Sequence, residues 1–235
     1  WLSVANYSGG SLSLLPVLQN GSIGKIAAQV QHFGKGINTE RQEKPHVHCV
    51  IFSKSGNYVA VTDLGIDQLF LYPIDKNKGV VNEQNAISTK VTAGAGPRHV
   101  VFHPTKKYVY LIEELTGSIS VFKWVENKLT LVQNTIMIAA SNLEGNTGAD
   151  IHISDDGKFL YASVRGNINE IRIFKINKNG TLSAIGKQDT KGINPRNFTI
   201  APSGKYLLVA NQSSDNFVVF KRNKKTGLLT DINKT

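Results

Sequence analysis

The chain of 235 residues repeats one pattern four times, and this repeat restricts its fold more than any other feature. Each copy has a strand opened by a polar residue, a tight turn, a second strand rich in β-branched and aromatic residues, a polar loop and a third strand. The copies cover residues 45–75, 96–124, 148–177 and 194–222, and residues 1–17 match the second half of the pattern. A period of roughly fifty residues made of short strands is typical of a β-propeller, in which each repeat is one blade.

The predicted strands fall at equivalent places in every copy. The first strands are expected at residues 48–52, 98–102, 149–153 and 196–200, and the second strands at 58–62, 108–112, 159–163 and 206–210. A fourth, less regular strand precedes the next copy. We therefore expect an all-β chain with one β-propeller domain over residues 1–235, built from four-stranded antiparallel blades. About five blades are counted, since the first segment lacks its first strand.

The charge balance limits the class of partner. A formal net charge of +10 and a pI of about 9.6 favour small anions, nucleic acid or an anionic surface. The lysines lie mostly in turns and no RNA-recognition or zinc-finger pattern occurs, so specific nucleic-acid binding is not expected. No apolar run approaches the length of a membrane span and no signal peptide is recognised, so we expect no membrane partner and a cytoplasmic location. The oligomeric state is left open.

Superposing the copies gives two columns of residues at the strand ends. The first column, which opens the first strand, contains His48, Arg98, Ala149 and Arg196. The second, just past the second strand, contains Tyr7, Leu64, Glu114, Arg165 and Gln212. In a propeller these positions converge on one mouth of the central channel. A single polar residue at a strand end often serves only the loop backbone, but three arginines, a histidine and a glutamate in register favour an anion-binding site.

Other kinds of site find less support. His46 and His48 form an H-x-H pair that suits a metal, but no matching set of Asp, Glu or His occurs in the other copies. The glycines of residues 8–10 and 93–96 lack the spacing of a phosphate loop, and no serine nucleophile elbow is present. We therefore predict no metal and no cofactor.

At these residues the chain resembles the seven-bladed β-propeller lactonases, which include propeller-type 6-phosphogluconolactonases and the carboxy-muconate lactonizing enzyme. The matching stretches are ANYSGGSLSLLPV, PHVHCVIFSKSGNYVAVTDLGIDQLFLY, AGAGPRHVVFHPTKKYVYLIEEL, ADIHISDDGKFLYASVRG and NPRNFTIAPSGKYLLVANQSSDNFVVF. They cover most of the chain in the order of the family. The resemblance implies seven blades, so the chain is expected to lack the first blade and the closing C-terminal strands and to be incomplete at both ends.

The resemblance also implies site residues. The family's catalytic positions correspond to His48, Arg98, Glu114 and Arg165, with His46 and Arg196 as substrate-binding residues. A carboxylate between arginines should have a lowered pKa, so we assign the general-base role to His48 and an orienting role to Glu114. The chain departs from the family at Asn197, which replaces a histidine.

The implied function is hydrolysis of a small anionic sugar lactone by a 6-phosphogluconolactonase-like enzyme, in the pentose phosphate pathway. One alternative is a carboxy-cis,cis-muconate lactonizing isomerase, which runs related chemistry in the opposite sense. Another is a non-catalytic propeller that serves as a binding scaffold. Fold alone does not separate the three.

Overall fold

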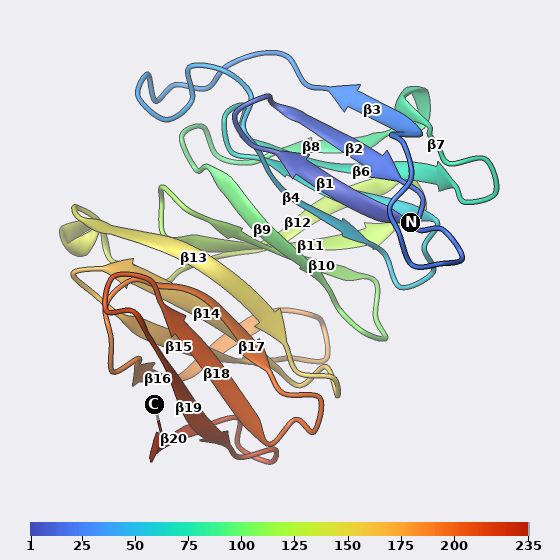
Figure 1. Ribbon diagram of the computed structural model, residues 1–235. Coiled ribbons are helices and arrows are strands. Elements are labelled where there is room, and N and C mark those ends of the chain that lie inside the picture. Colours follow the sequence, from blue (N-terminus) through green and yellow to red (C-terminus); the bar gives the residue numbers. More distant parts are fainter. Residues whose placement is uncertain (235) are drawn as a thin grey trace. The chain divides into compact units, whose positions relative to one another are not determined.

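The computed structural model describes residues 1–234 and is built almost entirely of antiparallel strands (Figure 1). Hydrogen bonding orders them in five sheets, β1-β2-β3, β4-β5-β6-β7, β12-β11-β10-β9, β13-β14-β15-β16 and β17-β18-β19-β20, with β8 also paired to β6. The helical segments of the described residues are two single turns, η1 (Glu83–Asn85) and η2 (Ala140–Asn142). None of the helices in this part of the chain is long or apolar enough to span a membrane. The all-β prediction is confirmed.

The chain divides into two compact units, Trp1–Phe102 with Trp124–Leu129, and His103–Lys123 with the residues from Thr130 onward. Strands of the first unit are β1 (Leu2–Asn6), β2 (Ser11–Leu15), β3 (Ala28–Gln31), β4 (Val47–Phe52), β5 (Tyr58–Asp63), β6 (Gln68–Asp75), β7 (Val80–Val81), β8 (Ile87–Lys90) and β9 (Pro97–Phe102). The sheet β1-β2-β3 has three strands because the first segment supplies no opening strand, as the sequence predicts. A core containing Leu12, Val30, Val47, Val61 and Tyr72 joins this sheet to β4–β7.

Strands of the second unit include β10 (Tyr108–Glu113), β13 (Asn146–Ile153), β14 (Phe159–Gly166), β15 (Glu170–Ile176), β16 (Leu182–Asp189), β17 (Pro195–Ile200), β18 (Tyr206–Asn211), β19 (Asn216–Arg222) and β20 (Leu229–Lys234). Strands β11 (Ser118–Val125) and β12 (Lys128–Ile136) complete the chain order. The core of this unit contains Tyr161, Ile173, Phe198, Val209 and Phe220.

Burial explains the sequence of each strand. The second strand of a repeat, such as β5 (YVAVTD) or β10 (YVYLIE), is buried over almost its whole length, so it reads as a continuous apolar run. The fourth strand, such as β16, is mostly exposed and is correspondingly polar. The first strands β4, β13 and β17 each lie at one edge of their sheet.

Candidate functional site

Three members of the first column lie at register shifts of the sheet, which are β-bulges. In the β4–β5 pair Val47 faces Asp63 and Cys49 faces Thr62, so His48 is the extra residue. In the β17–β18 pair the register also slips by one, and Arg196 is the extra residue. The β13–β14 register shifts between Gly148 and Ile151. A bulge bends its strand and re-aims a side chain, which is why bulges are common beside functional sites.

In the first unit the predicted residues form a cluster of rings around a buried arginine. The rings of Tyr7 and His46 are stacked with centroids 4.5 Å apart, and Tyr7 meets His48 edge-on at 5.4 Å. His48 in turn meets His99 at 5.2 Å. The guanidinium Nη1 of Arg98 donates to Nε2 of His99 at 3.1 Å, and Arg98 is 2% exposed. The structure therefore brings His46, His48 and Arg98 together through two rings, Tyr7 and His99.

His46 is held tightly by protein oxygens. Its Nδ1 lies 3.3 Å from the carbonyl oxygen of Tyr7, and its Nε2 lies 3.1 Å from both carboxylate oxygens of Glu43. The hydrogen bond from His46 lowers the pKa of the Glu43 carboxyl below its usual value. Since both ring nitrogens already face acceptors, a substrate contact by His46 would require one of these bonds to break. The substrate-binding role of His46 stays a prediction.

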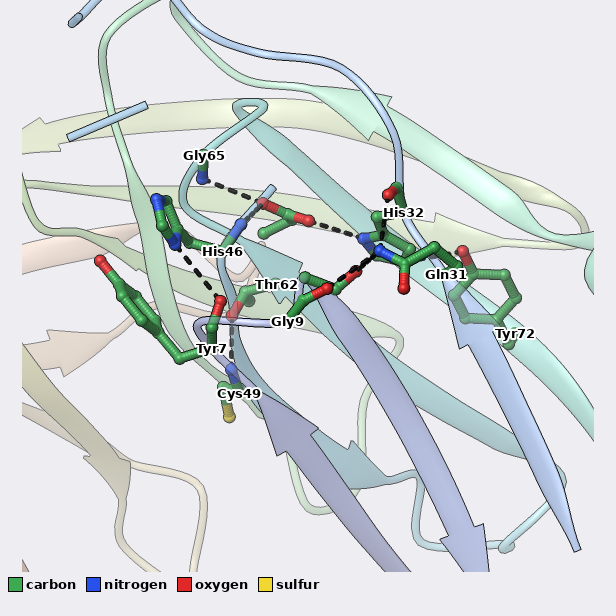
Figure 2. Close-up of polar contacts among 11 residues, drawn as sticks. Tyr7, Gly9, Gln31, His32, His46, Cys49, Thr62, Gly65 and Tyr72 are labelled. Carbon is green, nitrogen blue, oxygen red and sulfur yellow. Dashed lines mark hydrogen bonds and ion pairs between the residues drawn. The ribbon is translucent and has the colours of Figure 1, made fainter. Parts of the chain in front are cut away.

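A buried carboxylate holds the backbone of the segment that contains His46 (Figure 2). Asp63 is fully buried and accepts hydrogen bonds from the backbone N–H of His46 at 2.8 Å and of Gly65 at 2.9 Å. Its other oxygen pairs with Nδ1 of His32 at 2.7 Å, and Nε2 of His32 lies 3.0 Å from the hydroxyl of Tyr72. The carboxylate therefore ties the start of β4 to the core of the unit.

In the second unit the buried Glu114 and the partly buried Arg165 form an ion pair. Nη2 of Arg165 lies 3.4 Å from Oε1 of Glu114, and the two side chains are 14% and 2% exposed. Nε of Arg165 donates to the hydroxyl of Thr147 at 3.0 Å. The backbone N–H of Gly148 donates to the carbonyl of Glu114 at 3.1 Å. Removing one partner of such a pair would leave an uncompensated buried charge, so the guanidinium and the carboxylate fix each other's orientation.

Two further groups lie at the ends of the first strands in this unit. Arg196 is exposed, and its Nη1 donates to Oε1 of Gln212 at 3.4 Å. Oδ2 of Asp150, which is 2% exposed, lies 3.0 Å from Nε2 of His152 and accepts from the side-chain amide of Asn197 at 2.8 Å. Asn197, at which the resemblance implies a histidine, binds the carboxylate of Asp150 on β13.

Sequence reasoning missed several of these groups. Tyr7 lies in the second column, but the predicted site does not include it. Glu43 and His99 lie close in sequence to predicted site residues and are also not part of the predicted site. The contact of Thr147 with Arg165 depends on strand register. Within residues 1–234 no three side chains of His, Cys, Asp or Glu are grouped closely enough to bind a metal ion.

Comparison with known proteins identifies the family of this chain. The family model described as "Lactonase, 7-bladed beta-propeller" matches residues 1–235. A 6-phosphogluconolactonase of Formosa agariphila is 43% identical over 233 residues, covering 97% of this chain and 65% of the relative. The 6-phosphogluconolactonase of Bacillus subtilis is 36% identical, covering 96% of this chain and 64% of the relative.

Solved structures with a similar fold support the same family. A structure from Bacteroides fragilis has a TM-score of 0.88 and 39% identity, covering 99% of this chain and 66% of that one. The periplasmic gluconolactonase of Pseudomonas aeruginosa has a TM-score of 0.86 and 30% identity, covering 97% and 65%. The chain thus spans slightly less than two thirds of the length of these proteins. The β-propeller predicted from the repeat is confirmed, and the chain belongs to the seven-bladed β-propeller lactonase family.

Proposed function

We propose that the protein hydrolyses a phosphorylated sugar lactone, as a 6-phosphogluconolactonase. The observation that supports the proposal is the ion pair of Glu114 and Arg165, which orients a guanidinium at a residue that the resemblance assigns to the site. The chain's relatives bear this activity in their names. The net positive charge of the chain suits a substrate that carries a phosphate.

Lactone hydrolysis makes two chemical demands. A water oxygen must bond to the carbonyl carbon while it loses a proton, and the negative charge that develops on the carbonyl oxygen must be stabilised. The carbon–oxygen bond of the ring then breaks, and the ring oxygen takes up a proton to give the open acid.

The proposed roles follow from the side chains. His48 takes the proton from water and returns it to the ring oxygen. Arg98 and Arg165 bind the oxyanion or the phosphate, because a guanidinium offers planar bidentate donation. Glu114 orients Arg165 through the ion pair, and Arg196 is proposed as a contact for the phosphate. That these residues act on one substrate is part of the proposal.

The setting of the reaction is also proposed. Hydrolysis of 6-phosphogluconolactone would place the protein in the pentose phosphate pathway, without a metal or a cofactor. A cytoplasmic location stays a prediction, which cell fractionation tests, since one relative is named as periplasmic.

The test compares two arginine–glutamate pairs in the intact protein. We expect Arg165→Ala and Glu114→Gln each to lower kcat/KM for 6-phosphogluconolactone, Arg165→Ala by about a hundredfold or more, as is typical when an oxyanion donor is lost. The matched control is the pair Arg172–Glu170 on β15, whose Nη2 and Oε2 lie 3.1 Å apart outside the two columns. Arg172→Ala and Glu170→Gln should leave kcat/KM nearly unchanged.

Other outcomes would contradict the proposal. Full activity in both Arg165→Ala and Glu114→Gln would place the site elsewhere. An intact protein that cyclises a carboxy-muconate, and does not hydrolyse the lactone above the spontaneous rate, is an isomerase. A protein that does neither and retains a partner protein is a binding scaffold.

A further inference from the structure

Thr62 is a polar residue that follows the buried apolar residues of β5. It lies on β5 after Ala60 and Val61, and all three residues are fully buried. Burying a hydroxyl costs free energy unless it is hydrogen-bonded. Valine has nearly the same shape and would fill this position without that cost, so the hydroxyl of Thr62 needs an explanation.

The hydroxyl of Thr62 makes two hydrogen bonds, one to a residue of β4 and one to a residue of β9. It accepts a hydrogen bond from the backbone N–H of Cys49 at 3.1 Å, on the C-terminal side of the bulged residue His48 (Figure 2). It donates to the backbone carbonyl of Arg98 on β9 at 2.6 Å. One oxygen atom therefore connects the backbones that carry two proposed site residues, His48 and Arg98.

The equivalent positions of the other second strands show which of these two hydrogen bonds is not repeated. On β14, Ser163 accepts from the backbone N–H of Asp150 at 2.9 Å, so a hydroxyl again serves a bulge of the first strand. Among residues 1–234, Ser163 makes no second bond to a neighbouring first strand. On β18 the position is Ala210, and the bulged residue there, Arg196, is exposed. On β10 the position is Ile112, which has no hydroxyl. Among the equivalent positions described in residues 1–234, the hydroxyl of Thr62 is thus the one that connects two first strands.

Asp63 completes the support on the other side of the bulge. It accepts from the backbone N–H of His46, two residues before His48, while Thr62 accepts from the residue after it. Adjacent side chains of β5 therefore hold both ends of the bulged segment. Only Thr62 continues the contact to Arg98.

We propose that Thr62 is a positioning residue that sets His48 and Arg98 relative to each other for lactone hydrolysis, an inference that rests on the proposed function. Without the hydroxyl, the amide of Cys49 and the carbonyl of Arg98 lose a shared partner, and the two backbones shift independently. Misplacing catalytic groups by about 1 Å can cost on the order of a hundredfold in rate.

The experiment compares Thr62→Val, Thr62→Ser and Ser53→Ala in the intact protein. Thr62→Val keeps the shape and removes the hydroxyl, whereas Thr62→Ser keeps the hydroxyl. Ser53→Ala is the matched control, because Ser53 is also buried and its Oγ accepts from the backbone N–H of Tyr58 at 3.2 Å, just after the far end of β4. Rates are measured below the unfolding transition of every variant, and Thr62→Ala replaces Thr62→Val if the latter does not fold.

We expect Thr62→Val to lower kcat about tenfold to a hundredfold with little change in KM, and Thr62→Ser to restore most of the rate. Ser53→Ala should lower the unfolding temperature and leave kcat unchanged. In NMR spectra Thr62→Val should shift the ring resonances of His48 and the Nε–H resonance of Arg98, and Thr62→Ser should return them.

Each result bears on a different claim. If Thr62→Val keeps the kcat of the parent, or Thr62→Ser is as slow as Thr62→Val, the positioning role is wrong although the lactonase activity stands. If the parent does not hydrolyse the lactone, the proposed function fails. The positioning role is then decided by the resonances alone, and unchanged His48 and Arg98 signals in Thr62→Val would refute it.

Discussion

At the scale of single residues, His103 shows how one ring replaces a serine in the turn that precedes β10. Its Nδ1 accepts from the backbone N–H groups of Thr105 at 3.1 Å and Lys106 at 3.0 Å, and its Nε2 donates to the carbonyl of Gly157 at 3.1 Å. Ser154 occupies the equivalent place in the next repeat and accepts from Phe159. Burial lowers the pKa of His103, with a further contribution from the charge of Lys106. The hydrogen bond to Gly157 opposes this shift, but burial outweighs it, so the folded chain favours the neutral ring.

This geometry predicts a loss of stability in acid. The pKa of His103 is lower in the folded chain than in the unfolded chain, so the unfolded state binds more protons as the pH falls through the usual histidine value of about 6.5. The contribution of His103 is complete above that value and is lost below it. Urea unfolding one pH unit above and below it should show a smaller pH dependence in His103→Asn than in the parent.

The control for this measurement is Ser154→Ala, which removes turn hydrogen bonds without removing a titrating ring. It should lower the free energy of unfolding by the same amount at both pH values. An unaltered pH dependence in His103→Asn would show that the acid sensitivity arises elsewhere.

At the scale of strands and sheets, tyrosine hydroxyls join successive sheets of the second unit. Tyr110 on β10 donates to the carbonyl of Gly180 at 2.9 Å, in the turn between β15 and β16. Tyr161 on β14 donates to the carbonyl of Gly227 at 2.7 Å, in the turn between β19 and β20. Burial raises the pKa of both hydroxyls, so both remain donors at neutral pH. The same position in successive repeats thus makes the same contact.

The hydroxyl of Tyr161 has a hydrogen-bond partner that has no counterpart at Tyr110. This difference predicts which substitution lowers the free energy of unfolding more. Nε of the buried Arg222 donates to the hydroxyl of Tyr161 at 2.7 Å. Tyr110→Phe leaves one carbonyl without its donor, at a cost of about 1–3 kcal/mol. Tyr161→Phe also deprives a buried guanidinium of an acceptor, so it should lower the free energy of unfolding further. Denaturant titration of both variants measures this order, and an equal or reversed order would refute the role given to Arg222.

At the scale of the whole molecule, the charge of +10 is a property that no single contact explains. Lysines such as Lys107 and Lys224 lie in exposed turns, where surface charges add little to stability. Their summed field extends into solvent, attracts anions and raises the rate at which a charged substrate arrives. The basic composition therefore adds little to the fold and suits the anionic substrate proposed above.

Salt should consequently slow the reaction with a charged lactone. The screening length falls from about 10 Å at 0.1 M salt to about 3 Å at 1 M. We expect kcat/KM for 6-phosphogluconolactone to fall as salt is raised, while kcat at saturation changes little. The uncharged glucono-δ-lactone serves as the control. A kcat/KM that falls equally for both lactones would point to a general effect of salt on the protein.

The sequence alone shows the repeat and predicts the order of the strands, the turns and the two columns of strand-end residues. These features are local, because side-chain alternation and turn chemistry act over a few neighbouring residues. It also placed Glu114 and Arg165 in one column, and the structure joins them in an ion pair. That His48 and Arg196 are bulged and that Thr62 reaches Arg98 could not be predicted from the sequence. The physical reason is register: a slip of one residue turns every following side chain to the other face. The repeat fixes which strands pair, but the contacts between residues far apart in the chain are set when the sheets pack.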